Sequence, residues 1–346
     1  MLSLKAYLVK RILDVFKLKS YGRRNLYKSI FFALFFIWLS FSVEAYNQGQ
    51  VAVTLMLFIA VASIVLLTGL SGQISLGQGA LMAIGGYGSA LLIVNQNFPI
   101  WAALIGSIVI AFVSGLILGI ISARLSGPYL AGTTLVIALA IPTIANRFES
   151  VLAGNIGFMV DFKSPPAWVT QIFGELGYEH WQLIATLPFA TLTFFFISNI
   201  LKSRTGRSWK ALRDNETAAA LLGVKIGNTK VFVFAISSAF AGLAGALYGL
   251  RGIVGPSVYA VSLSLSLLTA AILGGVRSIF GALLGTVIIV FLPDWIHNVV
   301  KALELSEQIS NFLPAFFAGT LLVLTVVLNP GGIASNLHHH KKKTGQ

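Results

Sequence analysis

Long apolar segments, separated by short polar gaps, recur along the whole sequence and constrain its fold more than any other feature. Each is close to the 17–25 residues that an α-helix needs to cross a bilayer. Only 10% of the 346 residues are charged, whereas a soluble domain carries about 25%. A membrane β-barrel would instead show alternating segments of about 10 residues. We therefore expect an all-α polytopic membrane protein with about ten transmembrane helices, at 28–46, 51–69, 79–95, 100–122, 129–147, 182–201, 229–250, 262–276, 278–297 and 312–329.

The basic residues indicate which side of the membrane each connecting segment occupies. A cytoplasmic N-terminus places six segments inside: 1–28, 70–78, 123–128, 202–230, the turn at Arg277, and 330–346. Twenty of the 24 Lys and Arg residues then lie inside, as the positive-inside rule requires. The four outside are Arg147, Lys163, Arg251 and Lys301. We therefore expect both termini to be cytoplasmic, and cytoplasmic loops rather than nucleic-acid binding to explain the net charge of +13.

These spans divide the chain into regions: a basic cytoplasmic N-terminal segment at 1–27, a transmembrane domain at 28–330 with a cytoplasmic loop at 202–230 and an external loop at 148–181, and a basic cytoplasmic tail at 331–346. An alternative for the start is a signal peptide cleaved after Val43–Ala45, but about 28 residues before the apolar run is long for such a leader. The three histidines of the tail are expected to be a solvated end rather than a metal site.

A polar, glycine-rich stretch interrupts the apolar pattern in the sequence GLSGQISLGQGALMAIGGYGSALL (Gly69–Leu92). Irregular backbone at membrane depth is tolerated only where it lines a cavity or is buried in protein. One interpretation is a broken-helix element near 69–79 that lines or gates a transport path, with Gln73, Ser75 and Gln78 as neutral donors and acceptors. The alternative is an ordinary inner loop followed by a face of small residues that packs helices.

A second candidate for path lining is PYLAGTTLVIALAIP (Pro128–Pro142). Thr133 and Thr134 face the path in one interpretation, whereas in the other they bond their own helix backbone. Pro142 is expected to kink this helix. Glycines at GxxxG spacing are expected to pack helices, in the pairs Gly115 and Gly119, Gly245 and Gly249, and Gly281 and Gly285.

Several kinds of chemistry are disfavoured by what the sequence lacks. There are no cysteines, which excludes disulfides and thiolate sites. No Asp or Glu lies in the core of a predicted span, which weakens the hypothesis of an ion-coupled carrier, although backbone carbonyls can bind sodium. The sequence has no GxxxxGK[ST] phosphate loop, HExxH zinc pattern or credible nucleophile–base pair. We expect no catalytic residues, bound cofactor or metal in this chain. If the chain takes part in active transport, a partner protein is expected to supply the energy.

The largest inner loop, Lys202–Lys230, has the composition of a helix between Trp209 and Leu222. Asp214 or Asn215 is expected to cap a helix there, and Glu216 would lie in its first turn. In one interpretation the whole loop is a solvated basic segment and nothing more.

A more specific pattern in this loop is E-x-x-A-x-x-x-G, formed by Glu216, Ala219 and Gly223. Gly223 is expected to end the helix in a left-handed cap. Ala219 and Leu222 would form an exposed apolar edge, which needs a partner to cover it. The pattern resembles the coupling motif of ABC importer permeases, a short helix that fits a groove on the ATPase subunit. These four residues are therefore the candidates for ATPase coupling.

The chain as a whole resembles the branched-chain amino acid permease family of ABC importers, over roughly Thr54 to Pro330. The resemblance rests on four stretches in the expected order: TGLSGQISLGQGALMAIGGYGSALL, GPYLAGTTLVIALA, GRSWKALRDNETAAALLGVKIGNTKVFVFAISSAFAGLAGALYG and LTAAILGGVRSIFGALLG. It is most similar to the subunit type with a long N-terminal extension. Two departures are Arg277 and Ala282, where the family commonly has a glycine-rich turn with a proline, and the loop Ala153–Phe162, which keeps only part of the usual pattern.

The resemblance implies a multi-pass permease subunit in the bacterial inner membrane. It further implies a second homologous permease subunit, two cytoplasmic ATPase subunits that use ATP, and an extracytoplasmic solute-binding protein. The expected solutes are neutral or branched-chain amino acids, and an alternative is the same machinery carrying urea or short-chain amides. Alternatives of other classes are a stand-alone channel or facilitator and, less consistent with the missing catalytic set, a membrane-embedded enzyme.

Overall fold

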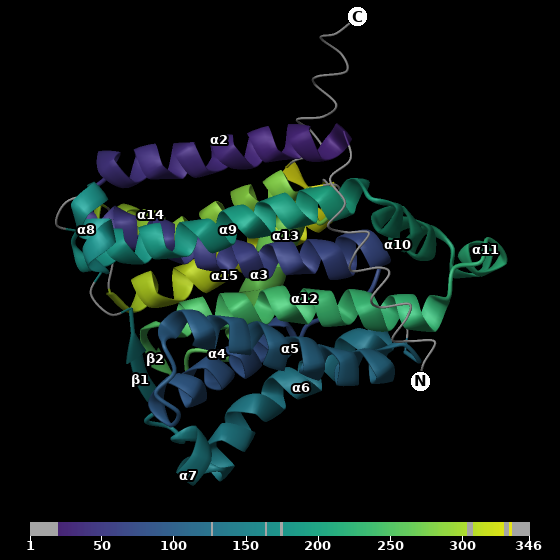
Figure 1. Cartoon of the computed structure of the whole chain (residues 1–346), viewed down its shortest axis with the longest axis horizontal. Helices are drawn as coiled ribbons and strands as arrows, with labels where there is room; N and C mark the ends of the chain where they lie inside the picture. The colour runs from purple at the N-terminus through teal and green to yellow at the C-terminus, as the bar shows by residue number, and fades with distance from the viewer. Residues whose placement is uncertain are drawn as a thin grey trace, which may run out of the picture.

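The computed structural model describes residues 20–125, 127–162, 165–173, 176–302, 307–328 and 332–333, so that most of the predicted N-terminal segment and tail lies outside the described residues. Within these ranges long helices lie side by side along one direction (Figure 1). They are α2 (Ser20–Ser42), α3 (Ala45–Ile64), α4 (Gln78–Val94), α5 (Ile100–Ser122), α6 (Pro128–Arg147), α9 (Tyr178–Lys202), α12 (Ile226–Gly249), α13 (Val261–Gly274), α14 (Ile279–Ala302) and α15 (Glu307–Leu328).

Each predicted span coincides with one of these helices, which confirms an all-α polytopic membrane protein. Seven helices in the described part are long and apolar enough to cross a membrane: Gly22–Ser42, Ala45–Leu70, Ile100–Ser122, Pro128–Arg147, Tyr178–Lys202, Ile226–Gly249 and Ile279–Ala302. Shorter apolar helices lie at Gln78–Val94, Val261–Gly274 and Phe316–Thr325. The number of about ten crossings therefore stays a prediction.

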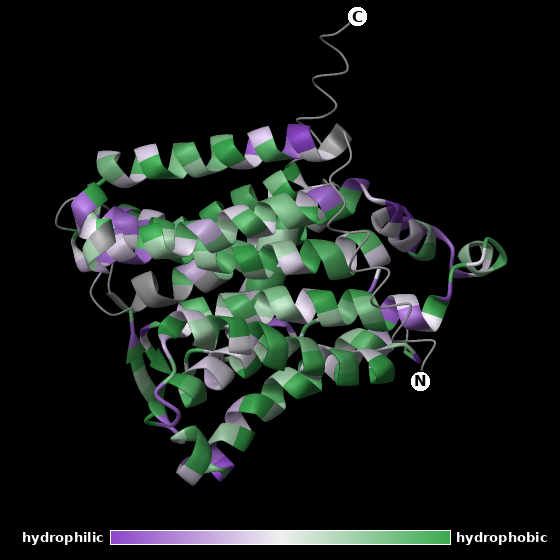
Figure 2. Cartoon of the chain, viewed as in Figure 1, coloured by the Kyte–Doolittle hydropathy of each residue, from purple (hydrophilic) through white to green (hydrophobic). Residues whose placement is uncertain are grey.

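The core of the bundle is built around α3 and α12, which are apolar on all sides and largely buried. α12 packs against α5, α4 and α3, and α3 packs against α9 and α14. The outer helices α2, α5 and α6 expose large apolar side chains, for example Phe31 at 72% and Ile105 at 64%, and most of their residues are hydrophobic (Figure 2). A helix that is buried all round belongs in a core, whereas the outer helices present the apolar surface that a bilayer or a second subunit covers.

Glycines permit the closest helix contacts. A methyl group on Gly245 of α12 would collide with the carbonyl group of Met82 of α4, and one on Gly285 of α14 would collide with that of Ala270 of α13. A methyl group on Gly115 of α5 would likewise overlap Ser238. The predicted packing role of these glycines is confirmed, because only a residue without a side chain lets the backbones approach so closely.

A two-stranded ladder closes one end of the bundle. β1 (Phe158–Asp161) pairs antiparallel with β2 (Arg251–Val254), and Phe158 lies opposite Val254. The same end carries the short helices α7 (Glu149–Leu152) and α8 (Ala167–Phe173), as Figure 1 shows. Hydrophobic patterning did not predict this ladder, since each strand has only four residues.

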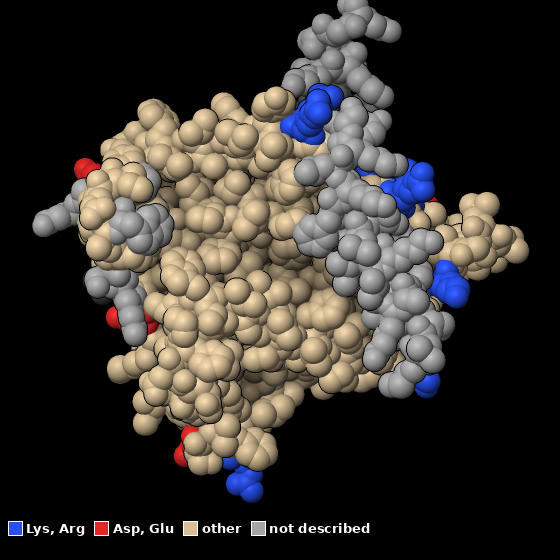
Figure 3. All heavy atoms as spheres, in the orientation of Figure 1, with Lys and Arg blue, Asp and Glu red and all other residues tan. Residues whose placement is uncertain are grey.

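The opposite end of the bundle carries α10 (Arg204–Asp214) and α11 (Glu216–Leu221). Two segments predicted to be cytoplasmic meet here, because Gly72 contacts Arg213. The span ends next to such segments also come together, because Gly69 contacts Val276 and Gly119 lies against Val231. Lys and Arg side chains gather at this end, and acidic side chains are seen mainly at the other (Figure 3). The structure thus groups the connecting segments at one end of the bundle as the basic residues predicted. The side of the membrane that each end faces stays a prediction.

Candidate functional site

A break in the helical backbone connects α3 to α4 at the α10 end of the bundle. α3 continues into the π-helix η1 (Val65–Leu70), residues 72–77 are not helical, and α4 begins at Gln78. Buried and exposed residues alternate along the break. Ser71, Gln73 and Ser75 are buried, whereas Gly72 and Ile74 between them are exposed. The structure therefore has a break in the helix at the predicted position, and both the path-lining element and the inner loop followed by a packing face stay predictions. A π-helical turn lies beside the break, and this geometry is frequent at functional sites.

The first polar contact of the break lies at the start of α4. Gln78 is buried, and its Nε2 donates to the hydroxyl groups of Ser63 and, at 3.2 Å, Ser237. The Ser237 hydroxyl in turn donates to the Ser63 carbonyl oxygen at 2.9 Å. These bonds join α3, α4 and α12 through neutral groups, so the end of the break is tied to the buried helix α12.

Gln73 forms the second contact, close to the N-terminal end of α12. Its Nε2 donates to the Ser71 hydroxyl at 3.0 Å and lies 3.4 Å from the carbonyl oxygen of Lys230. The Thr68 hydroxyl donates to the carbonyl oxygen of Gln73 at 3.1 Å. The Ser75 hydroxyl accepts a bond from the amide of Gly77 at 3.2 Å and so stabilises the turn into α4.

Two further helices supply hydroxyl groups that cap free amides of the break. The amide of Leu76 donates to Thr134 of α6 at 3.0 Å, and the amide of Gly79 donates to Ser264 of α13 at 2.9 Å. Both threonine hydroxyls donate to their own helix, Thr133 to the Tyr129 carbonyl and Thr134 to the Leu130 carbonyl at 3.0 Å. Thr134 belongs to the site because it is buried and also accepts the amide of the break, whereas the bond of Thr133 lies at an exposed position. We call the break and its partners the polar junction: Ser71–Gly79, Ser63, Thr134, Ser237 and Ser264.

Two acceptors in the polar junction have no protein partner among the described residues. They are the buried Oε1 atoms of Gln73 and Gln78. A buried acceptor without a hydrogen bond is costly, so both atoms suit a site that exchanges water or a polar solute during a working cycle. No group of three or more His, Cys, Asp or Glu residues that could hold a metal is found in the described part of the chain.

The predicted coupling helix is α11, and a second short helix, α10, precedes it in the same loop. α10 begins after Ser203, whose hydroxyl accepts the amide of Gly206 at 3.0 Å, and α11 begins after Asn215, whose Oδ1 accepts the amide of Ala218 at 2.9 Å. Of the two expected caps, Asn215 is the one that forms. Its extended backbone, with φ of −161°, separates α11 from α10.

Gly223 ends α11 in the predicted left-handed conformation, with φ of +82°. The amide of Val224 donates to the carbonyl of Ala219 at 3.0 Å, and the amide of Gly223 donates to that of Ala220 at 2.9 Å. This pair of bonds is a Schellman motif. A side chain at Gly223 would meet nothing within 4 Å in this chain, so space around it is free for another protein.

The exposed apolar edge of α11 differs from the prediction in one position. Ala219 is 1% exposed, because it faces the bundle, whereas Leu221 and Leu222 are 86% and 81% exposed. The edge is therefore formed by the two leucines, and α11 protrudes beyond the ends of the long helices (Figure 1). Hydrophobic patterning could not separate these roles, because α11 has only six residues.

Two basic residues connect this segment to the polar junction. The Arg213 guanidinium at the end of α10 donates to the carbonyl oxygen of Gly69 at 2.7 Å. Lys230, whose side chain is 6% exposed, pairs with Glu216 of α11 at 2.7 Å, and its backbone carbonyl faces Gln73. The sequence analysis counted both residues only as positive charges on the inner side. The signal for Lys230 was its position directly before the apolar run VFVFA, where a lysine is expected to need a partner.

Comparison with known proteins decides the family. The family described as "Branched-chain amino acid transport system / permease component" matches residues 28–326. This chain belongs to that permease family. The predicted resemblance is confirmed, and the permease is a multi-pass membrane protein.

Individual relatives agree with this assignment. The permease is 30% identical over 285 residues to the high-affinity branched-chain amino acid transport system permease protein LivM of Escherichia coli, over 77% of this chain and 64% of that protein's length. It is 28% identical over 248 residues to the probable branched-chain amino acid transport permease protein LivM of Methanocaldococcus jannaschii, over 70% and 69% of the two chains. It is 25% identical over 281 residues to the permease protein LivH of Escherichia coli, over 77% and 86%.

Proposed function

We propose that this permease is one subunit of an ABC importer for branched-chain or other neutral amino acids. It pairs with a second, homologous permease subunit, takes solute from an extracytoplasmic binding protein, and is driven by two cytoplasmic ATPase subunits. Relatives named LivM and LivH, which are described as permease proteins of branched-chain amino acid transport systems, support a pair of unlike permeases. The end that carries α10 and α11 faces the cytoplasm in this proposal.

The observation that carries the proposal is the pair of leucines at the tip of α11. Leu221 and Leu222 are exposed on a short, capped helix outside the bundle. Exposed large apolar groups are expected to be covered by a partner. Glu216 at the start of α11 pairs with Lys230, and Arg213 at the end of the preceding α10 bonds to Gly69, so both helices are connected to residues beside the polar junction. In this proposal a movement of the tip reaches the break through these two contacts.

The polar junction is the proposed inner part of the translocation path. Gln73, Gln78 and Thr134 offer neutral donors and acceptors, and two of their acceptor atoms are unpaired. A path of neutral groups suits a zwitterionic or uncharged solute, so the chemistry is consistent with amino acids and also with urea or short amides. Transport assays of the assembled importer with leucine, alanine and urea separate these solutes.

Co-purification tests the coupling proposal. The double variant Leu221→Ser/Leu222→Ser should lose the ATPase subunits when the permease is purified from membranes in mild detergent. The matched control is Ile156→Ser at the opposite end, because Ile156 is 81% exposed, like Leu222. It should retain the ATPase subunits in full.

Two results would count against an importer. One is a wild-type permease that purifies with no ATPase subunit and conducts solute without ATP, which is the behaviour of a stand-alone channel. The other is a bulky substitution at Gly223 that leaves ATP-driven uptake unchanged at normal expression. In the proposal this substitution separates ATP hydrolysis from uptake, because it fills the space where the partner approaches α11.

A further inference from the structure

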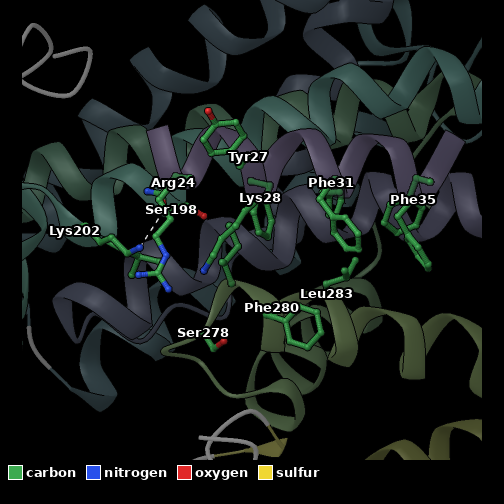
Figure 4. Close-up of a pocket in the computed structure, with 16 residues that line it drawn as sticks. Arg24, Tyr27, Lys28, Phe31, Phe35, Ser198, Lys202, Ser278, Phe280 and Leu283 are labelled. Atoms are coloured by element: carbon green, nitrogen blue, oxygen red, sulfur yellow. Dashed lines mark hydrogen bonds between the residues drawn. The ribbon is translucent and has the colours of Figure 1, made fainter. Parts of the chain in front are cut away.

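A second site lies on the lateral surface of the bundle, away from the polar junction. A groove of about 980 Å³ opens between α2, α9 and α14 at the α10 end. Figure 4 shows that its basic side chains lie toward one end and its phenylalanines extend toward the other. Neither the break nor α11 contributes to its lining.

The basic end of the groove is formed by Arg24, Lys28 and Lys202. Lys202 donates to Oδ1 of Asn25 at 3.0 Å, and the buried Asn25 donates its amide to Asn199 at 2.7 Å. This chain of hydrogen bonds holds the Lys202 ammonium group at the groove, where it interacts with two like charges.

No acidic residue lines the groove among the residues that the structure describes. The ion pairs found in the same ranges, Arg213–Asp214 and Lys230–Glu216, lie elsewhere. Three cations held together repel one another unless an anion joins them. The basic end is thus complementary to a group with one or more negative charges.

The apolar part of the groove continues from the basic end along α2 and α14. Phe31 is 72% exposed, Phe35 44% and Phe280 51%, and the buried Leu283 lies between them in Figure 4. A soluble anion would use only the basic end. The continuous apolar wall indicates a ligand that has a charged head and a hydrocarbon chain.

We propose that this groove binds an anionic phospholipid. Its phosphate group is held by Arg24, Lys28 and Lys202, and an acyl chain lies against Phe31, Phe35 and Phe280. Basic pockets between transmembrane helices on the cytoplasmic side are suited to anionic head groups, because the inner leaflet carries the negative lipids. The three cations of the groove belong to the end of the bundle where Lys and Arg gather (Figure 3), which faces the cytoplasm in the proposed function.

Lipid retention by the full-length permease tests the proposal. The detergent-purified protein is incubated with phosphatidylglycerol or with zwitterionic phosphatidylcholine, and bound lipid is counted by native mass spectrometry. We expect preferential retention of phosphatidylglycerol, weakened by about fivefold for each cation removed in Arg24→Gln and Lys28→Gln. The matched control is Lys225→Gln, since Lys225 is exposed at the same end but does not line the groove.

Three outcomes would overturn the proposal. They are equal retention of the two lipids, an equal loss in Lys225→Gln, and complete displacement of phosphatidylglycerol by inorganic phosphate. The last result would mean that the cations bind a free anion and that the apolar wall contributes nothing.

Photocrosslinking in membranes identifies the occupant directly. p-Benzoylphenylalanine replaces Phe31 in the full chain, and illumination should give an adduct with the mass of a phospholipid. Crosslinks formed instead to a peptide of the same chain or to another permease subunit would show that protein covers the groove, and would overturn the lipid assignment.

Discussion

The guanidinium group of Arg213 donates a hydrogen bond to the carbonyl oxygen of Gly69, at 2.7 Å, across 144 residues of sequence. Arg213 is the second-last residue of α10, and Gly69 lies in the π-helical turn that precedes the break in the helix. The end of a helix has carbonyl groups without intrahelical partners, and the Arg213 side chain supplies a hydrogen-bond donor to one of them. The contact makes the position of α10 and the shape of the break depend on each other.

Arg213→Ala should impair transport more than assembly. The variant removes the only described side-chain donor to Gly69, and a hydrogen bond from a charged donor contributes about 1.5–3 kcal/mol. We expect a lower thermal unfolding temperature and reduced uptake in proteoliposomes, with the ATPase subunits still bound. The control Asp214→Asn should change little, because Asp214 is 63% exposed and surface pairs contribute about 0–1 kcal/mol. Equal effects of the two variants would contradict this role.

The Glu216–Lys230 pair should behave as a coupled unit. Glu216→Gln leaves the Lys230 ammonium buried without its carboxylate partner, which is strongly destabilising. The double variant Glu216→Gln/Lys230→Met removes the buried charge as well, so it should be less destabilised than the sum of the single variants. A double-mutant cycle from thermal unfolding should give a coupling of about 0.5–3 kcal/mol. Strict additivity would show that the pair does not fix α11 to α12.

Gly223→Ala should weaken the coupling helix through the backbone alone. Its φ of +82° costs a residue with a Cβ about 1–2 kcal/mol, while the surrounding space is open. We expect reduced co-purification of ATPase subunits, partly restored in Gly223→Asn, because asparagine tolerates this conformation. The matched control is Gly227→Ala, which also meets nothing within 4 Å and has no positive φ. It should leave the complex intact.

Gln78→Leu should reduce uptake by more than it reduces stability. The variant removes the donor to Ser63 and Ser237, but it also removes the unpaired buried acceptor Oε1. These two effects on the free energy of unfolding oppose each other. The control Ser89→Ala, in the same helix, removes a buried hydroxyl whose bond within the described residues goes to the Gly86 carbonyl, away from the break, and it should retain uptake. Normal uptake in Gln78→Leu would exclude this side chain from the path.

Labelling of single cysteines tests the orientation. The chain has no natural cysteine, so Ile156→Cys and Lys225→Cys each carry one exposed thiol, at opposite ends of the bundle. A membrane-impermeant maleimide added to spheroplasts should label Ile156→Cys at once and Lys225→Cys only after permeabilisation. The reverse pattern would show that α10 and α11 face outward and would remove the basis for ATPase coupling.

The sequence by itself determined the helices, the grouping of their connecting segments and the chemistry of two caps. Hydropathy over about 20 residues identifies a helix that must satisfy its backbone in lipid, and α5 begins and ends at the predicted residues 100 and 122. Basic residues marked the segments that meet at one end. Asn215 and Gly223 were predictable because capping is a property of adjacent residues.

Only the tertiary structure decided which side chains form the site. Thr133 and Thr134 are neighbours of the same type, yet packing of α6 against the break brings only Thr134 to it. Ala219 is buried although the local pattern suggested an exposed edge, since its burial depends on how α11 lies against α12. The contact of Arg213 with Gly69 joins positions 144 residues apart. Local patterns determine which helices form, whereas contacts between distant residues depend on the packing of the whole bundle.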